Sequence, residues 1–227
     1  AWDAVTDLLE RRAGLLDGVV FSGGEPTMQP ALVAAAREVR ARGFKVGLHT
    51  GGAYPARLRA LVGAGKRERA DGRKAVPSGD SSRTTSTQGG VVATSDGCAL
   101  DWVGLDLKAP PHLYSDVIQA PGPAWERFSE SFGVLASAGV EVEVRTTVTP
   151  GLCGEIERLV DAFADLADGN PTFENRSLVL QQARPDGAPA SFAQALPEPR
   201  EWAKTFGDTV DRARACGERR GVTITSR

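Results

Sequence analysis

The amino-acid sequence predicts an α/β protein built on parallel strands, and two observations carry this prediction. Short apolar runs typical of buried strands alternate with helical patterns along most of the 227 residues. Polar residues follow the ends of successive runs, and the carboxyl ends of parallel strands meet at one edge of a sheet. An open doubly wound sheet and a (β/α) barrel both fit this pattern. No G-x-G-x-x-G motif follows the first run, so a dinucleotide-binding fold loses support.

Hydrophobic periodicity places the elements of the first part of the chain. An apolar stripe predicts a helix over residues 2–12. Because this helix opens the chain with no initiator methionine and no preceding strand, we expect that upstream chain has been lost. The run GVVFS predicts a buried strand over residues 18–22, and a helical stripe closed by Gly43 follows it. A strand over residues 44–49 and a helix over residues 54–62 come next.

Residues 66–90 interrupt the alternation. Serine, threonine, glycine, lysine and arginine dominate there, and the only aliphatic residues are Ala70, Ala75 and Val76. Such a segment buries too little apolar surface to offset its ordering entropy. We expect a disordered insertion in one loop of a single domain that spans residues 1–227. A tolerated surface insertion and a partner-binding arm are both open as its role.

The alternation resumes after this segment. Expected strands cover residues 102–108, 140–148, 177–181 and 222–225. Apolar stripes mark three expected helices: one from Trp125 that Gly139 ends, one over Ile156 to Phe163, and a last long helix that includes Trp202 and Val210. In the first of these strands, period-two alternation turns Val103, Leu105 and Leu107 toward the helices and the polar residues toward the other face.

Composition and charge argue against several classes of protein. The formal net charge of −2 gives no nucleic-acid footprint, and no apolar run approaches the ~20 residues of a membrane span. Without a recognisable signal segment, we expect a cytoplasmic protein that binds neither nucleic acid nor membrane. The cysteines, Cys98, Cys153 and Cys216, are dispersed along the chain. This predicts free thiols in a reducing compartment, and neither a disulfide framework nor a metal site.

The most specific motif is the segment FSGGEP, residues 21–26, which lies where a strand ends and a helix is about to begin. Gly23 and Gly24 carry no side chains, so a ligand can approach the backbone closely. Their carbonyl groups and the Glu25 carboxylate, with Ser22 beside them, form an acceptor-rich cup that suits an ammonium group. The alternative is a tight strand–helix turn with a solvated Glu25.

Further candidate residues stand at the ends of the next two strands. His49 and Thr50 end the strand that begins at residue 44. Asp106 and Lys108 stand two apart on one strand and share a face, so both charges point into the mouth of a barrel. The alternatives are a structural ion pair between Asp106 and Lys108, or a Schiff-base amine at Lys108.

Arg145 and Gln181 complete the candidate set. Arg145 shares a strand face with Glu143, and a guanidinium can clamp a ligand carboxylate bidentately. The alternative is an ion pair between Arg145 and Glu143 along the strand. Gln181 ends the next strand, where a ligand-facing role has weaker support.

Five stretches together resemble the radical S-adenosylmethionine (SAM) superfamily, and in particular its activating proteins for anaerobic ribonucleotide reductase and related glycyl-radical enzymes. The stretches are LLDGVVFSGGEPTMQ (15–29), KVGLHTGGAYPARL (45–58), DWVGLDLKAP (101–110), VEVRTTVTPG (142–151) and LVLQQARPDG (178–187). They follow the family's order and rough spacing, interrupted only by residues 66–90. The resemblance implies a partial (β/α) barrel of the radical SAM type, with parallel strands.

The resemblance also implies a role for the glycine-rich motif. In the family, the methionine amino group of SAM binds the G-G-E segment. This role carries over to Gly23, Gly24 and Glu25, with Ser22 beside them.

The remaining candidates take roles from the neighbouring strands. In the family, the positions of His49 and Thr50 help to hold the nucleoside. The positions of Asp106 and Lys108 contact the carboxylate or ribose region of SAM in the family, and the position of Arg145 lies near SAM. Pyruvate formate-lyase activases carry an aspartate at the position of His49. This departure favours the ribonucleotide-reductase branch and argues against a cation site built on that aspartate.

The family's chemistry also needs a four-iron (4Fe–4S) cluster held by a C-x3-C-x2-C triplet, which this sequence lacks. Cys98, Cys153 and Cys216 are too widely spaced to replace the triplet. In relatives, the triplet follows the first barrel strand and precedes the S-G-G-E strand, so we expect both that strand and the cluster loop to lie before Ala1. The chain is then expected to be an N-terminally truncated fragment that forms no cluster and no radical by itself.

In intact form, the implied enzyme cleaves SAM to a 5′-deoxyadenosyl radical and installs a glycyl radical on anaerobic ribonucleoside-triphosphate reductase. Its implied electron donor is a protein such as flavodoxin or ferredoxin. A pyruvate formate-lyase-type activase or another radical SAM enzyme is the sibling alternative. From other classes, a Schiff-base barrel lyase that uses Lys108 and a non-catalytic SAM-binding module also fit the residues.

Overall fold

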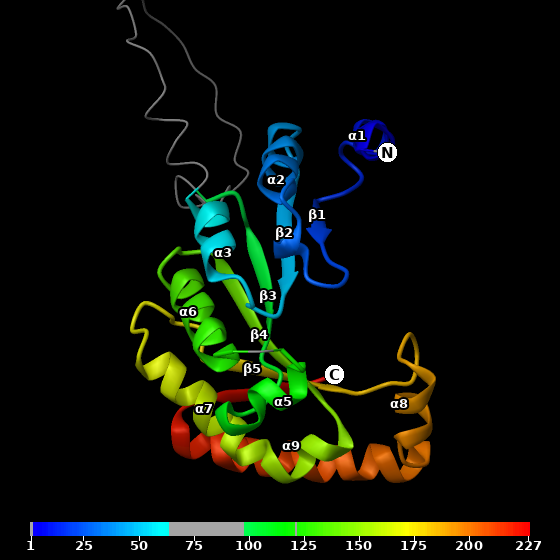
Figure 1. Cartoon of the computed structure of the whole chain (residues 1–227), viewed down its shortest axis with the longest axis vertical. Helices are drawn as coiled ribbons and strands as arrows, with labels where there is room; N and C mark the ends of the chain where they lie inside the picture. Colours follow the sequence, from blue (N-terminus) through cyan, green and yellow to red (C-terminus); the bar gives the residue numbers. More distant parts are fainter. Residues whose placement is uncertain (1, 64–97, 121) are drawn as a thin grey trace, which may run out of the picture.

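Within the described residues, six strands form one parallel sheet (Figure 1). The structure is a computed structural model that describes residues 2–63, 98–120 and 122–227. The insertion expected over residues 66–90 lies outside these ranges. The strands are β1 (Gly18–Phe21), β2 (Lys45–Thr50), β3 (Trp102–Asp106), β4 (Glu141–Val148), β5 (Ser177–Gln182) and β6 (Thr223–Ser226). They pair in sequence order, and each pairing is parallel.

Helices and short turns connect the strands. The helices are α1 (Trp2–Arg11), α2 (Leu32–Ala41), α3 (Pro55–Val62), α5 (Tyr114–Ile118), α6 (Ala124–Ala136), α7 (Ile156–Asp168), α8 (Ala190–Ala195) and α9 (Pro199–Arg220). Three short 3-10 segments, η1 (Pro26–Met28), η2 (Pro111–Leu113) and η3 (Pro150–Glu155), each begin at a proline. The longer helices match the predicted ones, whereas the 3-10 segments, α5 and α8 were not predicted. No described helix has both the length and the apolar composition that a bilayer crossing requires.

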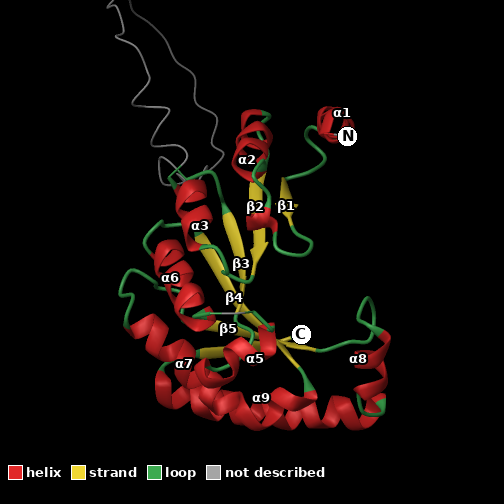
Figure 2. Ribbon diagram, viewed as in Figure 1, coloured by secondary structure: helices red, strands yellow, loops and turns green. Residues whose placement is uncertain are grey.

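The strand order identifies the architecture. The order never reverses along the sheet, so the doubly wound alternative is wrong, because that fold requires a reversal. Figure 2 shows α3, α6, α7 and α9 following one another along one side of the curved sheet. β1 and β6 remain at the two edges of the described sheet. The fold is therefore an unclosed, partial (β/α) barrel, which confirms the predicted fold class.

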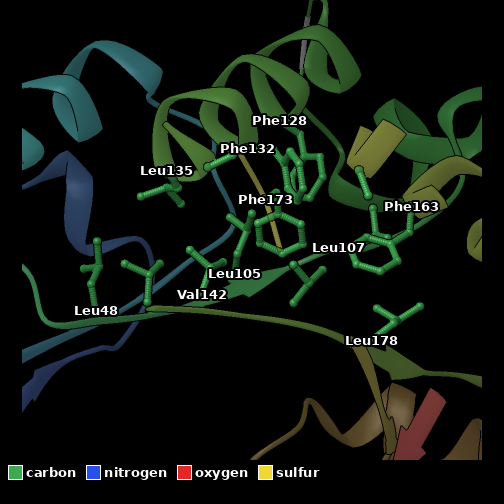
Figure 3. Close-up of a cluster of buried hydrophobic side chains, with 14 of the residues drawn as sticks. Leu48, Leu105, Leu107, Phe128, Phe132, Leu135, Val142, Phe163, Phe173 and Leu178 are labelled. Carbon is green, nitrogen blue, oxygen red and sulfur yellow. The ribbon is translucent and has the colours of Figure 1, made fainter. Parts of the chain in front are cut away.

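The core lies between the sheet and the helices (Figure 3). Val103, Leu105 and Leu107 are fully buried and point toward the helices, as the alternation in this strand predicts. Phe132 of α6 and Phe163 of α7 pack edge to face there, with ring centroids 6.3 Å apart. Burial of each such side chain stabilises the fold by about 1.5–3 kcal/mol. Because the apolar residues of the inner strands face the helices, the opposite, concave face is left to polar residues.

Candidate functional site

The turn after β1 exposes backbone rather than side chains. Gly23 and Gly24 adopt left-handed φ values of 91° and 53°, which favour glycine strongly. A Cβ atom at either position would meet nothing within 4 Å, so the space beside the turn is open. In the part of the chain that the structure describes, no residue donates a hydrogen bond to the carbonyl oxygen of either glycine. These two carbonyl groups, with exposed Ser22 before them, are therefore available to a ligand donor.

Glu25 is partly buried, and its carboxylate is bound by protein donors rather than by solvent alone. Its Oε1 accepts hydrogen bonds from the Thr27 amide at 3.1 Å, the Thr27 hydroxyl at 2.5 Å and the Thr50 hydroxyl at 2.8 Å. Its Oε2 accepts one from the Gly51 amide at 2.8 Å. Glu25 thus caps η1 and ties the turn to the end of β2.

A charged cluster occupies the concave face at the carboxyl ends of β3 and β4. Arg145 Nε donates to Asp106 Oδ1 at 2.5 Å, because Asp106 and Arg145 are register partners in adjacent strands. Lys108 Nζ donates to the other carboxylate oxygen of Asp106 at 2.9 Å. The Asp106–Lys108 ion pair considered for these residues is therefore present. Arg145 Nη1 lies 3.2 Å from His49 Nε2, so the cluster extends to the end of β2.

The electrostatics of this cluster fix two protonation states. Burial would raise the pKa of Asp106, but Lys108 and Arg145 outweigh it and hold the pKa below its ordinary value. Burial first, and then the charge of Arg145, lower the pKa of His49. His49 is therefore neutral at pH 7. Because a guanidinium can only donate, Nε2 of His49 accepts and its proton is on Nδ1.

A tryptophan that the sequence did not assign to the site lies on the same face. Trp102 packs edge to face with His49, with ring centroids 5.2 Å apart. A Cβ atom at Gly47 would lie 3.3 Å from the indole, and one at Gly104 would lie 2.8 Å from it. The indole therefore lies over both glycines. The sequence contained a signal for this position: Gly47 and Gly104 lie in adjacent strands on the same face as Trp102, and their missing side chains leave room for the indole.

The Arg145–Glu143 pair proposed from the sequence is not observed. Glu143 instead pairs with Arg227, whose Nη2 lies 2.8 Å from Oε1. With its amide oriented to accept, Gln181 also binds Arg227, at 3.0 Å from Nε. Gln181 and Glu143 thus form a second polar group on the concave face. The structure brings His49, Asp106, Lys108 and Arg145 into direct contact, and links Thr50 to Glu25 separately.

The described residues do not fit an iron–sulfur cluster. In the ranges that the structure describes, no three histidine, cysteine or acidic side chains converge on a possible metal position. Cys98 precedes the amino end of β3, Cys153 lies in η3 and Cys216 lies on α9. Burial raises the pKa of Cys98, and also that of Cys216, so both thiols are poor thiolate donors. All three are free cysteines, as predicted.

Comparison with known proteins extends the fold assignment. No protein-family model matches the sequence, and no curated protein matches it. Among solved structures, a domain of pyruvate-formate lyase-activating enzyme from Bacteroides vulgatus is similar at a TM-score of 0.55 and 14% identity, over 92% of this chain and 98% of that one. Native anSMEcpe with bound AdoMet and Kp18Cys peptide is similar at a TM-score of 0.54 and 13% identity, over 92% of this chain and 49% of that one.

These similarities define the class of the fold. This chain shares an unclosed, partial (β/α) barrel with the activating-enzyme domain along nearly the full length of both. It spans about half of anSMEcpe.

Proposed function

We propose that this chain is the SAM-binding part of a radical SAM activating enzyme. One observation carries the proposal: the open Gly23–Gly24 turn, His49 and the Asp106–Arg145–Lys108 cluster lie at the carboxyl ends of β1 to β4. Barrel enzymes place their ligands at this edge. The similarity in fold to an activating-enzyme domain and to a structure with bound AdoMet supports the same ligand.

SAM carries one ammonium, one carboxylate and one sulfonium group, and the described residues offer a partner for the first two. The free carbonyl groups of Gly23 and Gly24 would accept hydrogen bonds from the ammonium. The Lys108 side chain is 40% exposed although it pairs with Asp106, so its ammonium can reach a ligand. That ammonium would bind the carboxylate of SAM. Arg145 binds Asp106 and contacts His49, so these two residues would hold the Asp106–Lys108 ion pair in position without touching SAM. When bound, SAM supplies an adenosyl group activated by the sulfonium.

Generation of a radical from SAM requires a 4Fe–4S cluster, and the described cysteines do not fit one. As the partner of this enzyme we propose a glycyl-radical enzyme of the anaerobic ribonucleoside-triphosphate reductase type, with flavodoxin or ferredoxin as electron donor. His49, in place of the aspartate of pyruvate formate-lyase activases, favours this branch. A pyruvate formate-lyase-type activase is the sibling candidate.

Isothermal titration calorimetry with the 227-residue chain tests the proposal. We expect saturable, one-to-one binding of SAM to the wild-type chain. Lys108→Ala should weaken this binding about tenfold, the loss typical of one charge-assisted hydrogen bond. Lys204→Ala is the matched control, because Lys204 is 81% exposed on α9, away from the cluster. No heat of binding for the wild-type chain, or equal affinities for the two variants, would overturn the proposal.

The Schiff-base alternative receives no support from the geometry. A Schiff-base amine must be free to attack a carbonyl group, whereas Lys108 Nζ donates a hydrogen bond to Asp106 Oδ2 at 2.9 Å. Borohydride treatment with carbonyl substrates is expected to leave Lys108 unmodified.

A further inference from the structure

We propose that Thr50 is a positioning residue that shapes the ammonium-binding part of the site. It acts through Glu25, the residue that follows the Gly23–Gly24 turn, by donating a hydrogen bond to its carboxylate. This inference rests on the proposed binding of SAM and goes beyond it, because it assigns the selectivity for the ammonium group to a buried hydroxyl that does not touch the ligand.

The Thr50 hydroxyl both donates and accepts a hydrogen bond within the protein. The side chain is at the end of β2 and is only 2% exposed. Its oxygen accepts a hydrogen bond from the Gly52 amide at 3.0 Å. Its proton therefore goes to Glu25 Oε1, which lies 2.8 Å away. A buried hydroxyl that donates to one group and accepts from another holds both partners in position, and its proton is not available to a ligand.

The carboxylate of Glu25 is also nearly saturated. An ionised carboxylate offers about four acceptor positions, and four donors approach this one. Three of them, from Thr27 and Thr50, converge on Oε1, and the Gly51 amide reaches Oε2. The negative charge is thus fixed beside the turn. It attracts an ammonium group electrostatically while the carbonyl groups of the turn make the contacts.

Loss of the hydroxyl would disturb both ends of this arrangement. Valine has nearly the volume of threonine, so Thr50→Val removes the donor to Glu25 without opening a cavity. The Gly52 amide also loses its acceptor. We expect Thr50→Val to weaken SAM binding about tenfold. Thr50→Ser keeps the hydroxyl and should bind SAM within about twofold of the wild-type chain.

A second ligand separates positioning from general damage to the fold. The desamino analogue of SAM has a hydrogen in place of the ammonium group and keeps the carboxylate, sulfonium and nucleoside. Because this analogue has nothing to place in the cup, Thr50→Val should bind it as tightly as the wild-type chain does. A purely structural role of Thr50 would weaken binding of both ligands by the same factor.

Calorimetric titration of both ligands into the wild-type chain, Thr50→Val and Thr50→Ser decides the question. A selective loss for SAM in Thr50→Val, restored in Thr50→Ser, supports the inference. Equal losses for both ligands, or no loss, overturn it and leave the proposed function intact. Absence of SAM binding in the wild-type chain overturns both. If Thr50→Val does not fold, Thr27→Val removes another hydroxyl donor to the same oxygen and must show the same selective loss.

Discussion

Replacement of Asp106 by asparagine tests how strongly the charged cluster holds the sheet together. Asp106→Asn keeps the shape of the side chain and removes the charge that faces both Arg145 and Lys108. Loss of one partner from a fully buried ion pair costs about 3–5 kcal/mol. Here the Arg145 side chain is 11% exposed and that of Asp106 is 26% exposed, so water screens part of the interaction. We expect the free energy of unfolding to fall by about 2 kcal/mol, or the Tm by about 4–8 °C.

Urea denaturation followed by circular dichroism measures this change. Glu130→Gln is the control, because the Arg59–Glu130 pair is 54% and 47% exposed and should contribute no more than about 0.5 kcal/mol. The folded-state pKa of Asp106 is lowered, so its contribution is present above the ordinary carboxyl pKa and is lost as the pH falls through the folded value. The difference between the wild-type chain and Asp106→Asn should therefore narrow as the pH falls below the ordinary carboxyl pKa of about 3.9. A loss no larger than that of Glu130→Gln, or a difference that widens in acid, would refute the reasoning.

Three further changes probe the packing of the sheet, the packing of the core and the titration of His49. Gly104→Ala places a Cβ atom 2.8 Å from the Trp102 ring, and should lower the free energy of unfolding by about 1–3 kcal/mol in urea titrations; wild-type stability would contradict this. Phe132→Ala opens a cavity at a side chain that is 1% exposed, and should lower the free energy of unfolding by about 3–5 kcal/mol. A loss below about 1 kcal/mol would contradict the placement of Phe132 in the core. Because the folded-state pKa of His49 is lowered, the unfolded chain binds its proton more tightly, and the wild-type chain should lose stability as the pH falls below about 6.5. His49→Gln cannot titrate, so its stability should fall less between about pH 7.5 and pH 5, and equal slopes would count against this assignment.

The alternation of apolar runs was enough to predict the fold class and the strands. The strand predicted over residues 18–22 is β1, at Gly18–Phe21, and the last predicted strand is β6, at Thr223–Ser226. The short elements could not be predicted in this way. α8 contains no buried residue, so no apolar stripe marks it in the sequence. Its position depends on the loops that flank it rather than on its own periodicity.

The strand face of a side chain could be predicted, whereas its pairing partner could not be predicted reliably. The period of two placed Asp106 and Lys108 on one face, and the two side chains form an ion pair. The same rule suggested Glu143 as the partner of Arg145. The strand register instead sets Asp106 directly opposite Arg145, and that closer carboxylate forms the pair. Register follows from the packing of several elements and cannot be derived from one strand alone.

The end of β2 couples the two parts of the site. Successive residues of a strand point to opposite faces, so Thr50 reaches the Glu25 carboxylate while His49 reaches Arg145 on the concave face. The glycine-rich turn and the charged cluster are therefore both held by adjacent residues of one strand. A ligand whose ammonium lies at the turn and whose carboxylate lies at Lys108 would span this strand end. Its affinity would then depend on how rigidly β2 is fixed, and buried Leu48, just before these two residues, anchors that strand in the core.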